Sequence, residues 1–92
     1  IINNTGNITR VCLNGVVIIN SDYYYDVVRK NIKKYRKLAN LTQAELADLA
    51  GITMNYLAKI ESEKMQIGFS VAVIGRIADS LNIDIKLLFD IN

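Results

Sequence analysis

The side chains best suited to chemistry lie close together near the middle of the chain, between Thr53 and Lys59. The amide of Asn55 can offer adenine a paired donor and acceptor, and the ammonium of Lys59 can donate to guanine or to a phosphate. Met54 has no hydrogen bond to offer and would most naturally meet a thymine methyl. If this stretch is the recognition helix of a DNA-binding motif, residues near its start would point at base edges in the major groove. The base-reading candidates are therefore Thr53, Met54, Asn55 and Lys59.

The sequence lacks the combinations of residues that catalytic and metal-binding sites commonly use. The sequence contains no histidine and one cysteine, Cys12. Zinc sites, histidine-based acid–base catalysis and an intrachain disulfide therefore drop out. Nothing forms a nucleophile–base pair, and so we expect neither an enzyme nor a cofactor. No apolar run is long enough to span a membrane and no signal peptide is visible, which favours a cytoplasmic protein.

The element that must position the candidates is the stretch LTQAELADLAGITMNYLAKIE, residues 41–61. Thr42 and Glu45 have the spacing of a capping box, which begins a first helix. Gly51 can take the left-handed conformation that ends it. Thr53 can cap a second helix directly afterwards. A linker this short makes the two helices cross steeply, and so the stretch is predicted to be a helix-turn-helix.

Each motif helix has a predicted apolar face. The first helix carries Leu46, Ala47, Leu49 and Ala50 at spacings that share a face, and the second buries only Leu57 and Ile60. Little else on the second helix is apolar enough to require burial. Its outer side is therefore left to solvent, with Met54, Asn55, Ala58 and Lys59.

The stretch resembles the DNA-binding domain of phage lambda and 434 repressor and Cro, and of the XRE-like bacterial regulators that share it. The matching residues are Thr42-Gln43-Ala44-Glu45-Leu46-Ala47, Ala50-Gly51-Ile52-Thr53 and Tyr56-Leu57-Ala58-Lys59-Ile60-Glu61. Flanking residues extend the resemblance from about Val28 to Phe89. The resemblance implies an all-α, five-helix domain that binds double-stranded DNA.

The resemblance also assigns roles to residues around the second helix. It implies phosphate contacts by Gln43, Tyr56 and Lys64, and the exposed N–H groups and helix dipole beside Gln43 suit an anion independently. It implies a partly buried ion pair between Arg36 and Glu61. Simpler interpretations stay open at three positions: idle surface for Asn55, a gap-filling side chain for Met54, and packing against the neighbouring helix for Tyr56.

One departure from the family pattern concerns the end of the second motif helix. Relatives commonly have Asn-Gly before a basic residue, whereas Ser62-Glu63 precedes Lys64 here. The acidic Glu63 opposes a phosphate contact at this point. The loop that follows, up to Ser70, is also two residues longer than is common.

The net charge of +2 is mild, but its distribution is uneven. Six of the eleven basic residues fall within nine positions, namely Arg29, Lys30, Lys33, Lys34, Arg36 and Lys37. Such a run is compatible with a solvated helix face. Beside a helix-turn-helix, a phosphate-facing role for some of these residues becomes the better interpretation.

The flanking helices complete the predicted domain. The first runs from the Asn20-Ser21-Asp22 break to about Ala39, and Asn40 can end it. Its inner face is expected to hold Val28, Ile32, Tyr35 and Ala39. After a loop that turns Ile67 and Phe69 inward, Ser70 can cap a fourth helix over 71–81. Asp84 can cap a fifth over 85–89.

The N-terminal region is predicted to form a β-hairpin over residues 8–19. Two β-branched runs flank Asn14-Gly15, the strongest short-range signal for a two-residue turn. Pairing through that turn puts Leu13 opposite Val16 and Val11 opposite Ile18. Three outcomes stay open: packing on the chain's own helices, pairing with a second copy, or disorder. We assign residues 1–22 to this extension and 23–92 to the helix-turn-helix domain, with its motif at 42–61.

Two classes of function follow from these patterns. The favoured one is a sequence-specific regulator of transcription, a repressor that binds a palindromic operator as a homodimer, with the hairpin as a dimer contact. The alternative is an antitoxin or adapter whose helix-turn-helix face meets a protein partner, such as a toxin or co-regulator. Both would act in the cytoplasm as a bacterial or phage protein, the first on the nucleoid.

Overall fold

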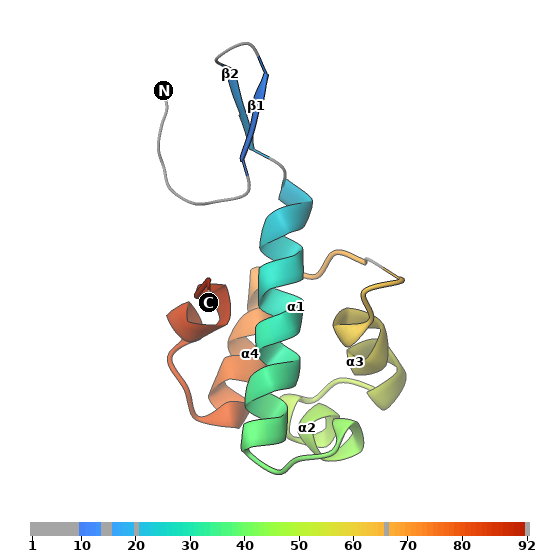
Figure 1. Ribbon diagram of the computed structural model, residues 1–92. Helices are drawn as coiled ribbons and strands as arrows, with labels where there is room; N and C mark the ends of the chain where they lie inside the picture. The colour runs from blue at the N-terminus through green and yellow to red at the C-terminus, as the bar shows by residue number, and fades with distance from the viewer. Residues whose placement is uncertain (1–9, 14–15, 20, 66, 92) are drawn as a thin grey trace.

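The computed structural model describes residues 10–13, 16–19, 21–65 and 67–91. Within these ranges it has two short strands, four α-helices and one 3-10 helix (Figure 1). The elements are β1 Arg10–Leu13, β2 Val16–Ile19, α1 Ser21–Leu38, α2 Gln43–Ala50, α3 Met54–Glu61, α4 Val71–Leu81 and η1 Ile85–Phe89. Ile8, where the hairpin was expected to begin, and the Asn14-Gly15 turn lie outside the described residues.

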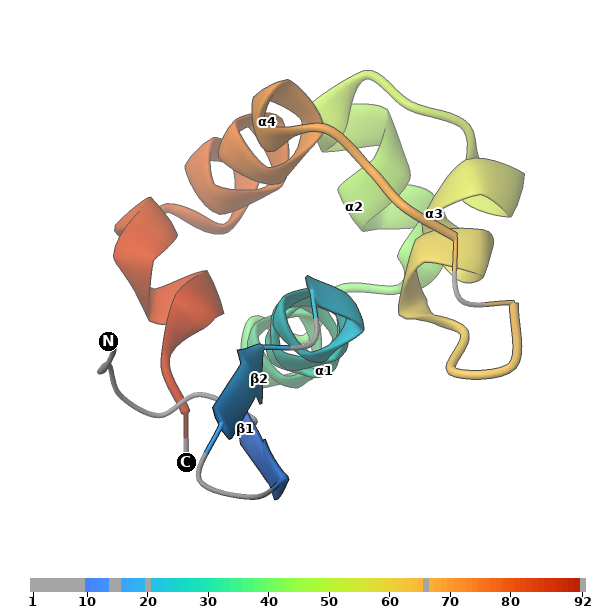
Figure 2. The ribbon, with the colours of Figure 1, turned by 90° about the horizontal axis from the view of Figure 1, so that it is seen from above.

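The helices are arranged around α1, which is the longest of them. Viewed from above, nearly along α1, the elements α2, α3, α4 and η1 form an arc around it (Figure 2). Helix α1 contacts α3, α4 and η1, and α2 packs against α3 and α4. Between them lies one apolar core, made of Val28, Ile32, Leu46, Ala47, Ala50, Leu57, Ile60, Phe69, Ile74, Ile77, Ala78, Leu81 and Leu88. Among the described residues, no helix is both long and apolar enough to cross a bilayer.

The strands β1 and β2 form a two-stranded antiparallel ribbon. Val11 pairs with Ile18, and Leu13 pairs with Val16. The ribbon lies beyond the N-terminal end of α1, at the opposite end of that helix from α2 (Figure 1). The core residues for which burial is described all follow the ribbon, from Val28 to Leu88, and they lie in helices or in the loop before α4.

Local capping explains where the helices begin. The hydroxyl oxygen of Thr42 accepts the backbone N–H of Glu45 at 3.1 Å, and the Glu45 carboxylate accepts that of Thr42 at 2.9 Å. This is the predicted capping box. The caps expected at Thr53, Ser70 and Asp84 are present as well. Each satisfies a backbone donor that the first turn of a helix cannot pair internally.

Three helices end at a residue in the left-handed conformation. These residues are Asn40, Gly51 and Asn82, with φ of 59°, 71° and 57°. In each case the N–H of the left-handed residue and the N–H of the next residue donate to carbonyls in the last turn of the helix, which is the Schellman arrangement. The predictions for Asn40 and Gly51 are confirmed, and the sharp reversal at Gly51 turns the chain from α2 into α3.

Three predictions about these elements were wrong. Leu49 was placed on the apolar face of α2 but is 60% exposed, because α3 and α4 meet the side of α2 that carries Leu46 and Ala50. Ala39 was placed on the inner face of α1, but α1 ends at Leu38 and Ala39 is exposed. The fifth helix is a 3-10 helix, because its hydrogen bonds join residues three apart: the N–H of Leu87 donates to the carbonyl of Asp84 at 2.9 Å.

Candidate nucleic-acid interface

The outer face of α3 presents the predicted base-reading residues together. Thr53, Met54, Asn55 and Lys59 are all exposed. Leu57 and Ile60, on the opposite face, are completely buried and fix which side of the helix looks outward. Asn55 and Lys59 are four residues apart, and so they lie one above the other on the same face. Among the described residues, Lys59 takes part in no ion pair, and its ammonium is available to a ligand.

Two side chains at the start of α3 have structural tasks. The hydroxyl oxygen of Thr53 accepts the backbone N–H of Tyr56 at 3.0 Å, which caps the helix. Accepting this bond does not use the hydroxyl hydrogen of Thr53. Tyr56 is half-buried and packs against the core. The packing interpretation of Tyr56 therefore holds for its ring, and a phosphate contact by its hydroxyl stays a prediction.

A buried ion pair joins α1 to the C-terminal end of α3. Nε of Arg36 donates to Oε2 of Glu61 at 2.8 Å, and Nη2 donates to Oε1 at 3.0 Å. The two residues are 9% and 6% exposed. The third nitrogen of Arg36 donates to the carbonyl of Leu41 at 2.9 Å, and so the same guanidinium also holds the link between α1 and α2. This two-pronged geometry orients α3 as well as joining it to α1.

The ends of α2 and α3 meet at Gln43. Its Nε2 donates to Oε1 of Glu61 at 3.0 Å, which places the N-terminus of α2 beside the C-terminus of α3. Gln43 is half-buried and keeps one amide hydrogen and its amide oxygen unused by this contact. Lys64 follows α3 by three residues and is exposed. Two of the three predicted phosphate contacts are thus located at the same end of α3.

Two basic residues of the run in α1 are buried, and sequence reasoning missed one of them. Arg29 is 2% exposed, and its Nη1 donates to the carbonyls of Ile60 and Ser62, both at 3.1 Å. Arg29 is therefore not among the residues of this run that can face a phosphate, and Arg36 is buried in an ion pair, as expected. The signal was present in the spacing, because residues seven apart in a helix share a face and Arg36 was already expected to turn inward.

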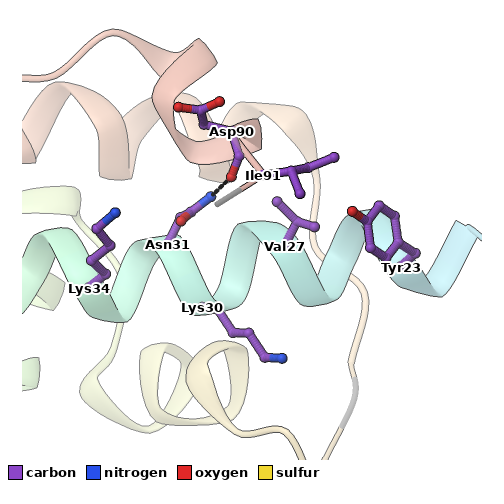
Figure 3. Close-up of a pocket in the computed structure, with 7 residues that line it drawn as sticks. All are labelled: Tyr23, Val27, Lys30, Asn31, Lys34, Asp90 and Ile91. Carbon is purple, nitrogen blue, oxygen red and sulfur yellow. Dashed lines mark hydrogen bonds between the residues drawn. The ribbon is translucent and has the colours of Figure 1, made fainter. Parts of the chain in front are cut away.

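The other basic residues of α1 lie on its surface. Lys30, Lys33, Lys34 and Lys37 are exposed. Lys30 and Lys34 line a pocket of about 420 Å³ between α1 and the C-terminal segment, but their side chains extend to opposite sides of α1 (Figure 3). The pocket is bounded by Asn31, whose Nδ2 donates to the carbonyl of Asp90 at 2.8 Å (Figure 3).

The chemistry available on the described residues is recognition rather than bond making. No group of three or more metal-binding side chains occurs in the part of the chain that the structure describes. The exposed helix offers amide, hydroxyl and ammonium groups, and its buried side is fixed to two neighbouring helices. The profile of the HTH_3 helix-turn-helix family matches residues 32–88, which include the motif and most of the core. The chain belongs to the helix-turn-helix family.

Relatives of known name agree with this helix-turn-helix assignment. The control protein C.SmaI of Serratia marcescens is 27% identical over 63 residues, covering 68% of this chain and 73% of that protein. The restriction-modification controller protein C.AhdI of Aeromonas hydrophila is 26% identical, with a TM-score of 0.64 over 71% of this chain and 96% of that one. A hypothetical transcription factor from Neisseria, NHTF, shares the fold at 21% identity, with a TM-score of 0.67 over 73% of this chain and 75% of that one.

The family and the relatives together define the class of this chain. It is a DNA-binding transcriptional regulator of the helix-turn-helix type. The relatives are regulators rather than enzymes, and this points to a non-enzymatic protein.

Proposed function

We propose that this chain is a repressor that binds a two-fold symmetric operator in double-stranded DNA as a homodimer. The observation that carries the proposal is the exposed face of α3, where Thr53, Asn55 and Lys59 offer hydrogen-bonding groups beside Met54. A helix of this width fits the major groove, where each base pair presents a distinct pattern of donors and acceptors. Asn55 pairs with adenine, Lys59 with guanine or a nearby phosphate, and Met54 with a thymine methyl.

Contacts to the DNA backbone fix the register of the helix. In this proposal Gln43 donates its second amide hydrogen to a phosphate while Glu61 holds its first. Lys64 and the Tyr56 hydroxyl contact phosphates on either side of the groove. Such contacts supply affinity and orientation without reading sequence, and base contacts supply the specificity. The bond between Gln43 and Glu61 links the two kinds of contact mechanically.

A homodimer follows from the symmetry of the proposed operator. The ribbon of β1 and β2 has two edges, and the edge of a two-stranded ribbon is a template for another strand. A second copy of this chain, related to the first by a two-fold axis, supplies such a strand. The ribbon also precedes the segment matched by the family, residues 32–88, and in this proposal it is an addition to the DNA-binding domain. We therefore propose that the hairpin mediates dimerisation.

The runner-up for the dimer contact is an apolar surface near η1. A pocket of about 250 Å³ there is lined by Tyr24, Tyr25, Val28, Phe69, Val71, Ile74 and Phe89. Val71 and Phe89 are 69% and 42% exposed. Deleting residues 1–20 and measuring mass in solution decides between the two. A truncated protein that dimerises as tightly as the full chain assigns the contact to this surface.

A second variant tests the hairpin without shortening the chain. Val11 and Ile18 are paired across the ribbon, and V11K with I18K places two positive charges directly opposite each other. If the hairpin mediates the dimer, this double variant is monomeric at concentrations at which the unaltered chain is dimeric. Unchanged mass in both the deletion and the double variant would remove the hairpin from the proposal.

The named relatives favour a particular set of target genes. C.SmaI and C.AhdI are control proteins, the second of a restriction-modification system. We propose that this chain likewise controls the genes of a restriction-modification system. A footprint on DNA upstream of such genes, at concentrations that leave random DNA free, supports the assignment. Protection confined to unrelated promoters refutes it.

Selection from a pool of random duplexes tests sequence-specific binding. The expected product is a palindrome whose half-sites are separated by about 34–36 Å, one helical turn. Binding to the selected duplex and to a scrambled one is then compared over a salt series, because non-specific binding depends almost wholly on counterion release. A pool that yields no preferred duplex rejects the proposed function.

A further inference from the structure

The C-terminal end of α3 differs from the ends of the other three α-helices. The other three helices end at Asn40, Gly51 and Asn82, which adopt the left-handed conformation. At each of these ends two backbone N–H groups donate to carbonyls in the last turn. Ser62 instead has an extended backbone, with φ of −80° and ψ of 121°, and returns its own N–H to the Lys59 carbonyl at 3.2 Å. The last carbonyls of α3 therefore need donors from elsewhere.

Arg29 supplies those donors from α1. Its Nη1 donates to the carbonyls of both Ile60 and Ser62, and its Nε donates to the carboxylate of Asp26 at 3.2 Å. The guanidinium carbon lies 6.0 Å from the ring centroid of Phe69, the last residue before the cap of α4. One buried side chain thus holds the end of α3 and contacts both ends of the loop that carries Lys64.

The two buried arginines together restrain the pose of α3. Arg29 binds its main chain and Arg36 binds its last side chain, Glu61, so that this end of the helix is fixed to α1 at two points. The base-reading residues are farther along the helix. Asn55 is six residues from Glu61, or roughly 9 Å at about 1.5 Å per residue. A tilt of about 10° around the fixed end would move Asn55 by roughly 1.5 Å, far more than a hydrogen bond to a base edge tolerates.

We propose that Arg29 is a positioning residue for sequence-specific DNA recognition. It keeps α3 at the angle at which its outer face meets the bases, although it makes no contact with DNA itself. The inference rests on the proposed function. Loss of Arg29 should lower specificity more than general affinity, because phosphate contacts by flexible lysines tolerate a small tilt and base contacts do not.

The test compares R29M with a matched control, N31A. Asn31 is 4% exposed and makes the same kind of contact elsewhere: its Nδ2 donates to the carbonyls of Leu88 and Asp90, at 2.9 and 2.8 Å. Both variants remove a buried donor to two backbone carbonyls, but only R29M affects α3. R29K retains a cation and serves as the conservative variant if R29M folds poorly.

The first measurement is the ratio of affinities for the duplex selected by the unaltered chain and for a scrambled duplex. It is taken at a temperature at which circular dichroism shows each variant folded. R29M is expected to lower the ratio at least tenfold, R29K to restore part of it, and N31A to keep it within about threefold. A ratio for R29M equal to that of the unaltered chain overturns the proposal.

The second measurement needs no DNA and separates this proposal from the proposed function. Amide hydrogen exchange in R29M should accelerate in residues 54–65 by tenfold or more, beyond any change in α2 and α4. In N31A the acceleration should centre on η1. An even acceleration across all helices of R29M overturns the positioning role. A chain that selects no duplex but shows the localised change rejects only the proposed function.

Discussion

Replacing Arg36 with methionine should destabilise the domain more than any exposed charge deletion. The change leaves the Glu61 carboxylate, in a residue 6% exposed, without its cation. Breaking a buried ion pair by removing one partner costs about 3–5 kcal/mol. Gln43 still donates to the same carboxylate, and so we expect the lower end, about 3 kcal/mol. Small domains have about 5–15 kcal/mol of total stability, and this loss is a large part of it.

The double variant R36M/E61L tests whether the stranded charge is the cause. With both charges gone, the expected loss falls to about 1–2 kcal/mol, which reflects the Leu41 carbonyl and the Gln43 amide left without partners. The free energies of unfolding are measured by urea titration followed by circular dichroism. They are compared only among variants whose free energy of unfolding falls with urea concentration at the same slope. The control K86M removes an exposed partner 3.9 Å from Asp84 and should cost about 1 kcal/mol or less. If R36M costs no more than K86M, the reasoning about the buried pair is refuted.

Four further outcomes are expected. N55A should relax preference at one base pair of each half-site, at a cost of about 1–3 kcal/mol, measured on single-substituted duplexes; uniform weakening would show that Asn55 reads no base. K64A should reduce the slope of log affinity against log salt by about one, and an unchanged slope removes Lys64 from the phosphate contacts. G51A should cost about 1–2 kcal/mol in urea unfolding because φ is 71°; a Cβ there meets no atom within 4 Å, and a neutral result contradicts the conformational explanation. T42A should cost about 1 kcal/mol through loss of the capping box, and equal stability would mean that water replaces the cap.

Features decided within a few residues could be predicted from the sequence. The caps at Thr42, Thr53 and Ser70 and the left-handed ends at Asn40 and Gly51 depend on side-chain type and spacing alone. The register of the motif follows from them. For the same reason the spacing of Leu57 and Ile60 was enough to locate the exposed face of α3.

Features decided by a neighbouring element were beyond such reasoning. Leu49 lies at the edge of an apolar stripe, and only the position of α3 and α4 against α2 determines that it stays exposed. Arg29 and Lys30 look alike in a basic run, and only the structure shows that Arg29 donates to two carbonyls at the end of α3. Asn31 was not singled out either, although it performs the corresponding task for η1. The spacing of Arg29 relative to Ile32 and Arg36 indicates that Arg29 lies on the inward face of α1. It does not identify the carbonyls of α3 as its hydrogen-bond partners.

The length of the motif helices links gene control to temperature. Helices α2 and α3 have eight residues each, whereas isolated helices shorter than about 12–15 residues are marginal in water. The surface proposed to read DNA therefore exists only in molecules whose core is assembled. If the proposed function holds, substitutions at core positions such as Ile77, a fully buried residue of α4, would reduce the number of folded molecules and leave the preferred DNA sequence unchanged. In a cell such alleles would behave as changes in regulator dosage, mild when cool and severe when warm.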